Sequence, residues 1–152
     1  MSYAESTTVP VDRSKAEIEK VLTRYGASGF GYMTQGLKAA IMFEANGLKV
    51  RFILPLPDPN SEEFSTTPTG RRRKGSSASS AYEQEQRRRW RALVLAIKAK
   101  LEAVETGITQ FEEEFLAHIV LPNGQTVADS AIPAIQSAYE SGQSVPLLPA
   151  FT

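Results

Sequence analysis

The chain has 152 residues, of which 41% are hydrophobic and 22% are charged, which predicts one folded domain over residues 1–152 and excludes a chain disordered throughout. Because cysteine is absent, disulfides, thiolate metal sites and a cysteine nucleophile are excluded. The 17 basic and 17 acidic residues balance, so any electrostatic partner must be bound by a local patch of charge.

The first regular element that the sequence predicts is a helix over residues 14–25. Ser14 and Glu17 have the spacing of a capping box, in which two side chains bind free backbone N–H groups at a helix start. Gly26 can adopt the left-handed conformation that ends a helix. An extended lead-in is expected before this helix, and a strand is expected after it, over residues 29–35.

The clearest local pattern is Asn46-Gly47, which stands between two hydrophobic runs. Both residues tolerate the positive φ angles of a two-residue type I′ turn, so the pattern predicts an antiparallel hairpin. Pairing outward from the turn separates a core face from a solvent face. The expected facing pairs are Phe43–Val50 and Ile41–Phe52 in the core, and Glu44–Lys49 and Met42–Arg51 in solvent.

A long, flexible loop is expected over residues 58–80, because its Ser, Thr, Pro, Gly and Arg content can bury little apolar surface. Loops of this length inside a small domain are usually functional or disordered. Four consecutive cations lie within it: Arg71, Arg72, Arg73 and Lys74.

A long helix is expected from Ala81 until Gly107, with Ser80 and Glu83 as its capping box. Its apolar stripe consists of Trp90, Leu93, Val94, Ile97, Leu101 and Val104. The first half of this helix is strongly basic. Its cations are Arg87, Arg88, Arg89 and Arg91, followed by Lys98 and Lys100.

Two short helices are expected near the carboxyl terminus. The first follows a capping box of Thr109 and Glu112 and directs Phe111, Phe115 and Ile119 inward. The second, over residues 128–141, presents an apolar stripe of Ile132, Ile135, Ala138 and Tyr139. The tail, residues 143–152, is expected to extend along the body. The predicted fold class is therefore α+β, with an N-terminal helix, a three-stranded antiparallel sheet, a long basic helix and two short helices.

The sequence favours no catalytic site. His118 lies one helical turn after Glu114, so the two could form an acid–base or metal-ligand pair, but a lone histidine in a short amphipathic helix more often has a structural role. None of the common nucleotide-binding, hydrolase or zinc-protease motifs occurs. We therefore expect no enzyme, no metal and no cofactor.

The predicted order of elements resembles the order found in three protein families. The three strands and long basic helix, residues 29–106, resemble the β-β-β-α core of RAD52-like single-strand annealing proteins, and less closely the double-stranded-RNA-binding domain. The order is also similar to restriction-endonuclease-like nucleases, whose third strand carries an acid two residues before a lysine. Residues 48–52 read Leu-Lys-Val-Arg-Phe and lack that acid.

A further resemblance covers most of the chain. The stretch RRRWRALVLAIKAKLEAVETG, followed by FEEEFLAHIVLPNGQTV, looks like small uncharacterised proteins of actinobacterial phages and prophages. That family brings no assigned activity and no site residues. It implies a place in phage DNA metabolism or in countering host defence.

We expect a phage-type accessory protein that binds nucleic acid, with single-stranded DNA as the first candidate. The residues expected to bind phosphates are Arg71, Arg72, Arg73, Lys74, Arg87, Arg88, Arg91 and Lys98. A solubilising role for the same charges remains open. The alternative function is a protein-interaction module, such as an inhibitor of a host enzyme, in which the cations bind an acidic partner. A homo-oligomer is also compatible with the sequence.

The expected location is the cytoplasm. The polar start of the chain lacks the apolar run of a signal peptide, and nowhere do about 18 apolar residues follow one another. No contact with a membrane is expected.

Overall fold

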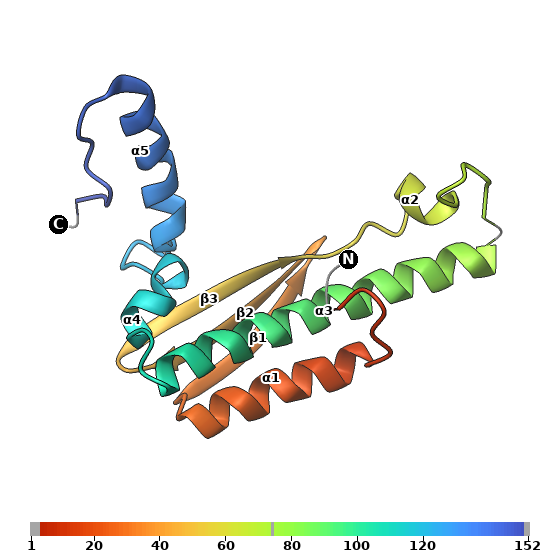
Figure 1. Ribbon diagram of the computed structural model, residues 1–152, viewed down its shortest axis with the longest axis horizontal. Helices are drawn as coiled ribbons and strands as arrows, with labels where there is room; N and C mark the ends of the chain where they lie inside the picture. The colour runs from red at the N-terminus through yellow and green to blue at the C-terminus, as the bar shows by residue number, and fades with distance from the viewer. Residues whose placement is uncertain (1–3, 74, 151–152) are drawn as a thin grey trace.

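The computed structural model describes residues 4–73 and 75–150 (Figure 1). Its elements confirm the α+β class and the predicted order of an N-terminal helix, a three-stranded antiparallel sheet, a long helix and short C-terminal helices. In chain order they are α1 (Val11–Tyr25), β1 (Gly29–Gln35), β2 (Lys38–Ala45), β3 (Leu48–Pro55), α2 (Glu62–Ser65), α3 (Gly75–Glu105), α4 (Phe111–Glu114), the 3₁₀ helix η1 (Leu116–His118) and α5 (Val127–Ser141).

The sheet has the order β1-β2-β3 with antiparallel neighbours. Asn46 and Gly47 both have positive φ, 53° and 77°, as a type I′ turn requires. All four facing pairs predicted for this hairpin are present in the register of β2 and β3. The sequence prediction of the turn, the register and the two faces is therefore confirmed.

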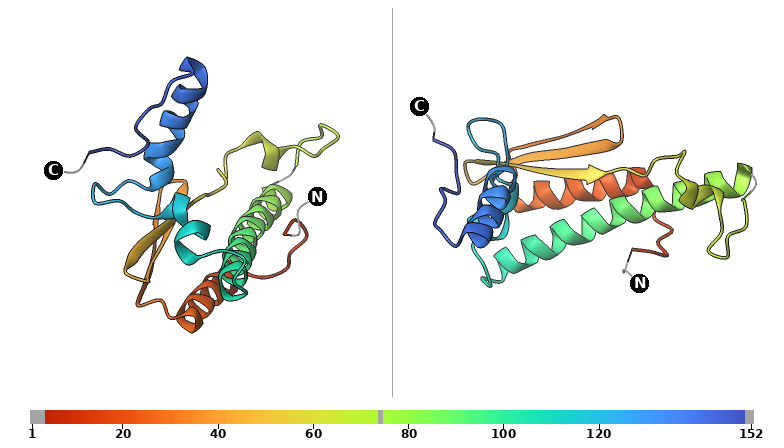
Figure 2. Two further views of the ribbon diagram at one scale, coloured as in Figure 1. Left: turned by 60° about the vertical axis from the view of Figure 1, so that its left-hand side comes forward. Right: turned by 90° about the horizontal axis from the view of Figure 1, so that it is seen from above.

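Helices α1 and α3 lie side by side and cover one face of the sheet (Figures 1 and 2). The core forms between this helical layer and the sheet. It contains Ile18 and Leu22 of α1, the sheet residues Ala39, Ile41, Phe43, Val50 and Phe52, the α3 residues Trp90, Leu93, Val94, Ile97 and Leu101, and Phe111 and Phe115 after α3. The predicted α3 stripe is thus buried, apart from the half-buried Val104.

Both long helices begin earlier than predicted, so the first two capping boxes are wrong. Helix α1 starts at Val11, and Ser14 is a buried residue inside it. The Ser14 backbone N–H donates to the carbonyl of Pro10, the extended residue that precedes the helix. The helical hydrogen bonds therefore begin directly after Pro10. Ser80 likewise lies inside α3, where its hydroxyl donates to the Ser76 carbonyl at 3.0 Å. That back-bond accommodates serine in a helix.

The segment predicted as a structureless loop, residues 58–80, contains the short helix α2 and the first turns of α3. Phe64 of α2 is buried and packs edge-on against Tyr82, with ring centroids 5.6 Å apart. This single aromatic contact anchors α2 to α3, and the sequence pattern around Phe64 gave no periodicity that would have revealed it.

The C-terminal region differs from its prediction in two ways. The capping box of α4 is formed by Gln110 and Glu113 and not by Thr109 and Glu112. In α5 the expected apolar stripe is exposed to solvent, with exposed fractions of 51% for Ile132, 41% for Ile135 and 87% for Tyr139. The reason is visible in Figure 1, where α5 projects away from the sheet. Among the described residues, no helix has both the length and the apolar composition needed to cross a membrane.

Candidate nucleic-acid interface

The charges of this neutral chain are separated along its length. Residues 71–91 contain eight Lys or Arg residues and two Glu residues, whereas residues 102–140 contain seven acidic residues and no Lys or Arg. Helix α3 has 31 residues and connects the two regions over roughly 46 Å. Figure 1 shows its amino end and α2 at one extremity of the molecule and α4 with α5 at the other. We call the first extremity the basic end, defined as residues 62–73 and 75–91.

Three arginines of the sequence-predicted site lie on the loop of the basic end. Arg71 and Arg72 are exposed and Arg73 is half-buried. Their backbone is held by a bridge between Thr66 and Arg72 and by the Thr67 N–H, which donates to the Arg71 carbonyl at 2.6 Å. Within the described residues their guanidinium groups form no ion pair. The loop is therefore tied down at its backbone while its cationic side chains remain available.

The next three arginines, on the first half of α3, have polar partners within the helix. Arg87 donates to the Gln84 side chain at 2.7 Å. Arg88 and Arg89 share the carboxylate of Glu85, at 3.1 and 2.8 Å. These i,i+3 and i,i+4 spacings stabilise the helix and partly neutralise its cations.

The last two predicted site residues, Arg91 and Lys98, face α1. Both bind the carboxylate of Glu17, with a Lys98–Glu17 distance of 3.1 Å. The hydrogen bond from Arg91 is the main reason why the pKa of Glu17 lies below its ordinary value. Arg91 and Lys98 thus join α1 to α3, and their charge is already compensated.

The remaining predicted site residue of this region, Lys74, lies outside the described residues. Tyr82 of α3 packs against Phe64, and its hydroxyl accepts a hydrogen bond from Gln86 at 2.9 Å. Helix α3 has no acidic residue in its first turn, so the positive end of its dipole is not neutralised there by a carboxylate of its own.

His118 and Glu114 do not form the acid–base pair considered from the sequence. The His118 ring stacks on Phe52 with a centroid distance of 4.1 Å. Burial, followed by the charge of Lys100, lowers the pKa of His118 and favours the neutral ring. Glu114 is held elsewhere, by Lys100 at 3.5 Å and by the Thr109 hydroxyl at 3.1 Å. In residues 4–73 and 75–150 no cluster of His, Asp and Glu has the geometry to hold a metal ion.

Sequence reasoning missed the carboxylates that partner the basic side chains. The contact of Glu85 with Arg88 and Arg89 could have been found, because i,i+3 and i,i+4 spacing places these charges together on any helix. The contact of Glu17 with Arg91 has no such signal, since 74 residues separate the two in the chain.

Comparison with known proteins adds no relative. No family model matches the chain, and no curated protein or solved structure matches it significantly.

Proposed function

We propose that the basic end binds nucleic acid, with Arg71, Arg72 and Arg73 as the primary phosphate contacts. The observation that carries this proposal is that the loop cations and the cations facing α1 differ in their ion pairing. The loop arginines form no ion pair in the described residues, whereas Arg91 and Lys98 are paired with Glu17. Unpaired arginines bind phosphate without first losing a carboxylate partner, so each contact releases counterions at little internal cost.

The amino end of α3 supports the same proposal. Its first turn has no acidic residue, and an uncompensated helix amino terminus attracts anions through its free N–H groups and its dipole. Arg87, Arg88 and Arg89 continue the positive surface along α3. Their partners, Gln84 and Glu85, orient the arginines while leaving excess positive charge.

Single-stranded DNA is the preferred ligand in this proposal. The order of three strands and a long basic helix resembles the annealing proteins of recombination, and the sequence resembles small phage proteins. The first resemblance supports single-strand binding in recombination, and the second supports a role in phage DNA metabolism. Arginines on an exposed loop favour contacts with the phosphate backbone of the nucleic acid over contacts that read a particular base sequence.

The test is fluorescence anisotropy with labelled single- and double-stranded DNA and RNA, measured at several salt concentrations. The variant R71A/R72A/R73A is compared with R13A/K20A/R24A, which removes three exposed cations from α1 and so makes the same change in net charge. We expect the loop variant to weaken binding and to reduce the slope of log K against log salt by about 2, at roughly 0.7 for each contact to a single strand.

Two results would reject the proposal. One is the absence of binding by the wild type at low salt, and the other is an equal loss of affinity in both triple variants. In either case the alternative function, an inhibitor whose cations bind an acidic surface on a host enzyme, would become the leading hypothesis.

A further inference from the structure

The free edge of β1 is the least protected polar surface of the fold. The sheet ends at β1, and no strand or bridge within the described residues pairs with its outer side. The opposite edge, β3, is partly covered, because the Val120 N–H donates to the Lys49 carbonyl at 2.8 Å and Arg89 donates to the Pro55 carbonyl at 2.9 Å. The outer edge of β3 is therefore partly covered, whereas the outer edge of β1 has no strand or bridge partner among the described residues.

The backbone groups that point out from this edge can be identified from the register. The Leu56 N–H donates to the Leu37 carbonyl, so odd-numbered β2 residues bond toward β3 and even-numbered ones toward β1. Their β1 partners, Gly31, Met33 and Gln35, therefore bond inward. Consequently Phe30, Tyr32 and Thr34 direct their N–H and C=O groups away from the sheet.

Natural sheets usually guard such an edge with lysine, proline or a bulge. Strand β1 has the sequence GFGYMTQ, without a charged residue or a proline, and its last five residues are exposed. The strand itself therefore places no like charges opposite one another when it meets a second copy. A cation beside this strand is Lys15 of α1, whose Nζ lies over the Tyr32 ring, 4.9 Å from its centroid.

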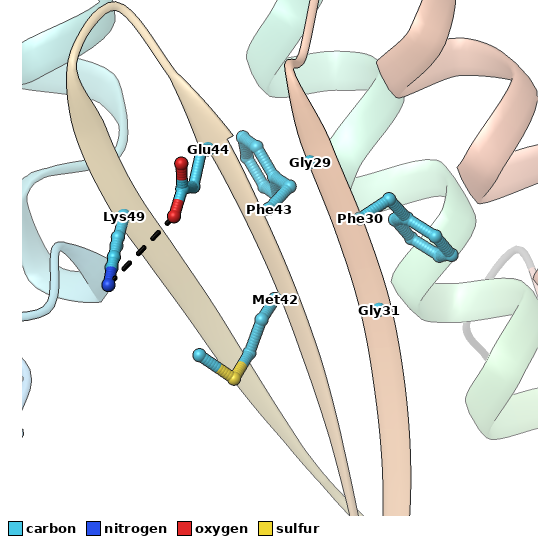
Figure 3. A pocket seen from close by; sticks show the side chains of 7 residues that line it. All are labelled: Gly29, Phe30, Gly31, Met42, Phe43, Glu44 and Lys49. Carbon is cyan, nitrogen blue, oxygen red and sulfur yellow. Dashed lines mark ion pairs between the residues drawn. The ribbon is translucent and has the colours of Figure 1, made fainter.

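A hollow lies on the outer sheet face beside this edge (Figure 3). Gly29 and Gly31 contribute no side chains there, while Met42, Glu44 and Lys49 project around it. The chain's own fold does not require either glycine. Neither has a positive φ, and a Cβ atom at Gly31 would meet no heavy atom within 4 Å. The hollow is thus space that this chain leaves unfilled.

We propose that two copies of the chain pair antiparallel through β1 about a two-fold axis at Tyr32, joining two three-stranded sheets into one. This register bonds Tyr32 to Tyr32 of the second copy and Phe30 to its Thr34, so that every outward backbone group of the three residues is satisfied. The interface is isologous and closes on itself.

The same register explains the hollow. Met33 of the second copy faces Gly31 on the outer side of the joined sheet, where its flexible side chain fills the space next to Met42. Met33 is 62% exposed and Met42 37% exposed in the single chain. The exposed Met33 side chain and the empty space therefore complement each other across the axis. This inference is independent of the proposed nucleic-acid binding, which uses the basic end.

The chain lacks cysteine, so a single introduced thiol reports the register. Directly bonded strand partners have Cα atoms about 5.5 Å apart, within the range of a disulfide. We expect Y32C to form a disulfide-linked dimer on mild oxidation. Q35C is the matched control, because Gln35 faces Gly29 of the second copy and is about 20 Å from its own symmetry mate at roughly 3.3 Å per residue.

Association itself is measured by sedimentation velocity over a range of concentrations. We expect the wild type to reach twice its 16.6 kDa mass, and T34P to remain monomeric because proline removes an outward N–H group without removing a bond to β2. T34A retains the N–H and should still associate. G31K is a second variant that should block pairing if T34P misfolds, and a Cβ atom at Gly31 meets no heavy atom within 4 Å in the single chain. Circular dichroism verifies that each variant is folded.

The proposal is overturned when the wild type is monomeric at every concentration, or when Q35C cross-links as readily as Y32C. Loss of DNA binding in R71A/R72A/R73A with dimerisation intact would separate the two functions.

Discussion

At the scale of single residues, Glu17 is a charged side chain that joins two helices. It lies on α1 and binds both Arg91 and Lys98 of α3. The lowered pKa of Glu17 means that the folded state binds a proton less readily than the unfolded chain. Its contribution to stability is therefore fully present above its ordinary pKa of 4.5 and is lost as pH falls through the lower folded value.

We expect E17Q to lower the free energy of unfolding at pH 7 by about 1 kcal/mol, because the ion pair is only partly exposed but is still screened by solvent. The loss should shrink as pH falls below 4.5, because the wild-type carboxylate is protonated as pH falls through its lower folded pKa. Urea unfolding at pH 7 and at a series of pH values below 4.5 measures the difference. E19Q is the control, since Glu19 is exposed and forms no ion pair with any of the described residues. A loss independent of pH would contradict the role of the carboxylate charge.

At the scale of elements, α3 and α5 are both amphipathic in sequence but differ in burial. Helix α3 packs its stripe against the sheet and α1, whereas the main contacts of α5 are with η1. Hydrophobic periodicity predicts which residues of a helix share a face. It does not say whether another element is present to cover that face, and for α5 none of the described elements does so.

The two isoleucines at comparable stripe positions make this difference measurable. I97A should lower the free energy of unfolding by about 2–5 kcal/mol, because Ile97 is 1% exposed and its loss leaves a cavity. I135A makes the same chemical change at a residue that is 41% exposed, and should change stability by no more than about 0.5 kcal/mol. Thermal or urea unfolding compares them. Equal losses would show that α5 packs against the body more closely than the structure has it.

At the scale of the whole molecule, the main feature is the separation of charge between the basic end and the acidic α4–α5 region. A net charge of zero conceals two local fields of opposite sign. Within the basic end, Glu85 reduces the field by pairing with Arg88 and Arg89. Its removal should therefore increase the affinity for a polyanion.

We expect E85Q to bind single-stranded DNA more tightly than the wild type, with a salt slope steeper by about 0.7 for each additional phosphate contact. E83Q makes the same change in net charge at an exposed glutamate that forms no ion pair within residues 4–73 and 75–150. Anisotropy titrations compare the three proteins. An equal effect of both substitutions would indicate that only the overall field matters and that Arg88 and Arg89 make no direct contact.

Local patterns by themselves determined the fold class, the hairpin and the α3 stripe. Asn46-Gly47 requires positive φ at two neighbouring residues, and strict alternation then fixes the register of β2 and β3. Both effects act between residues close in the chain, so the sequence alone reveals them. The sequence alone also identified Arg71, Arg72 and Arg73 as candidate phosphate contacts, because a run of consecutive cations can be recognised without a structure.

Only the tertiary structure decided which charges are paired and which apolar faces are covered. Glu17 meets Arg91 across 74 residues, and Ser14 is buried inside a helix that it was expected to cap. Ile132 and Tyr139 stay exposed because no element among the described residues covers that face of α5. In each case the outcome depends on packing between segments far apart in the sequence. A local sequence pattern carries no information about the free energy of that packing.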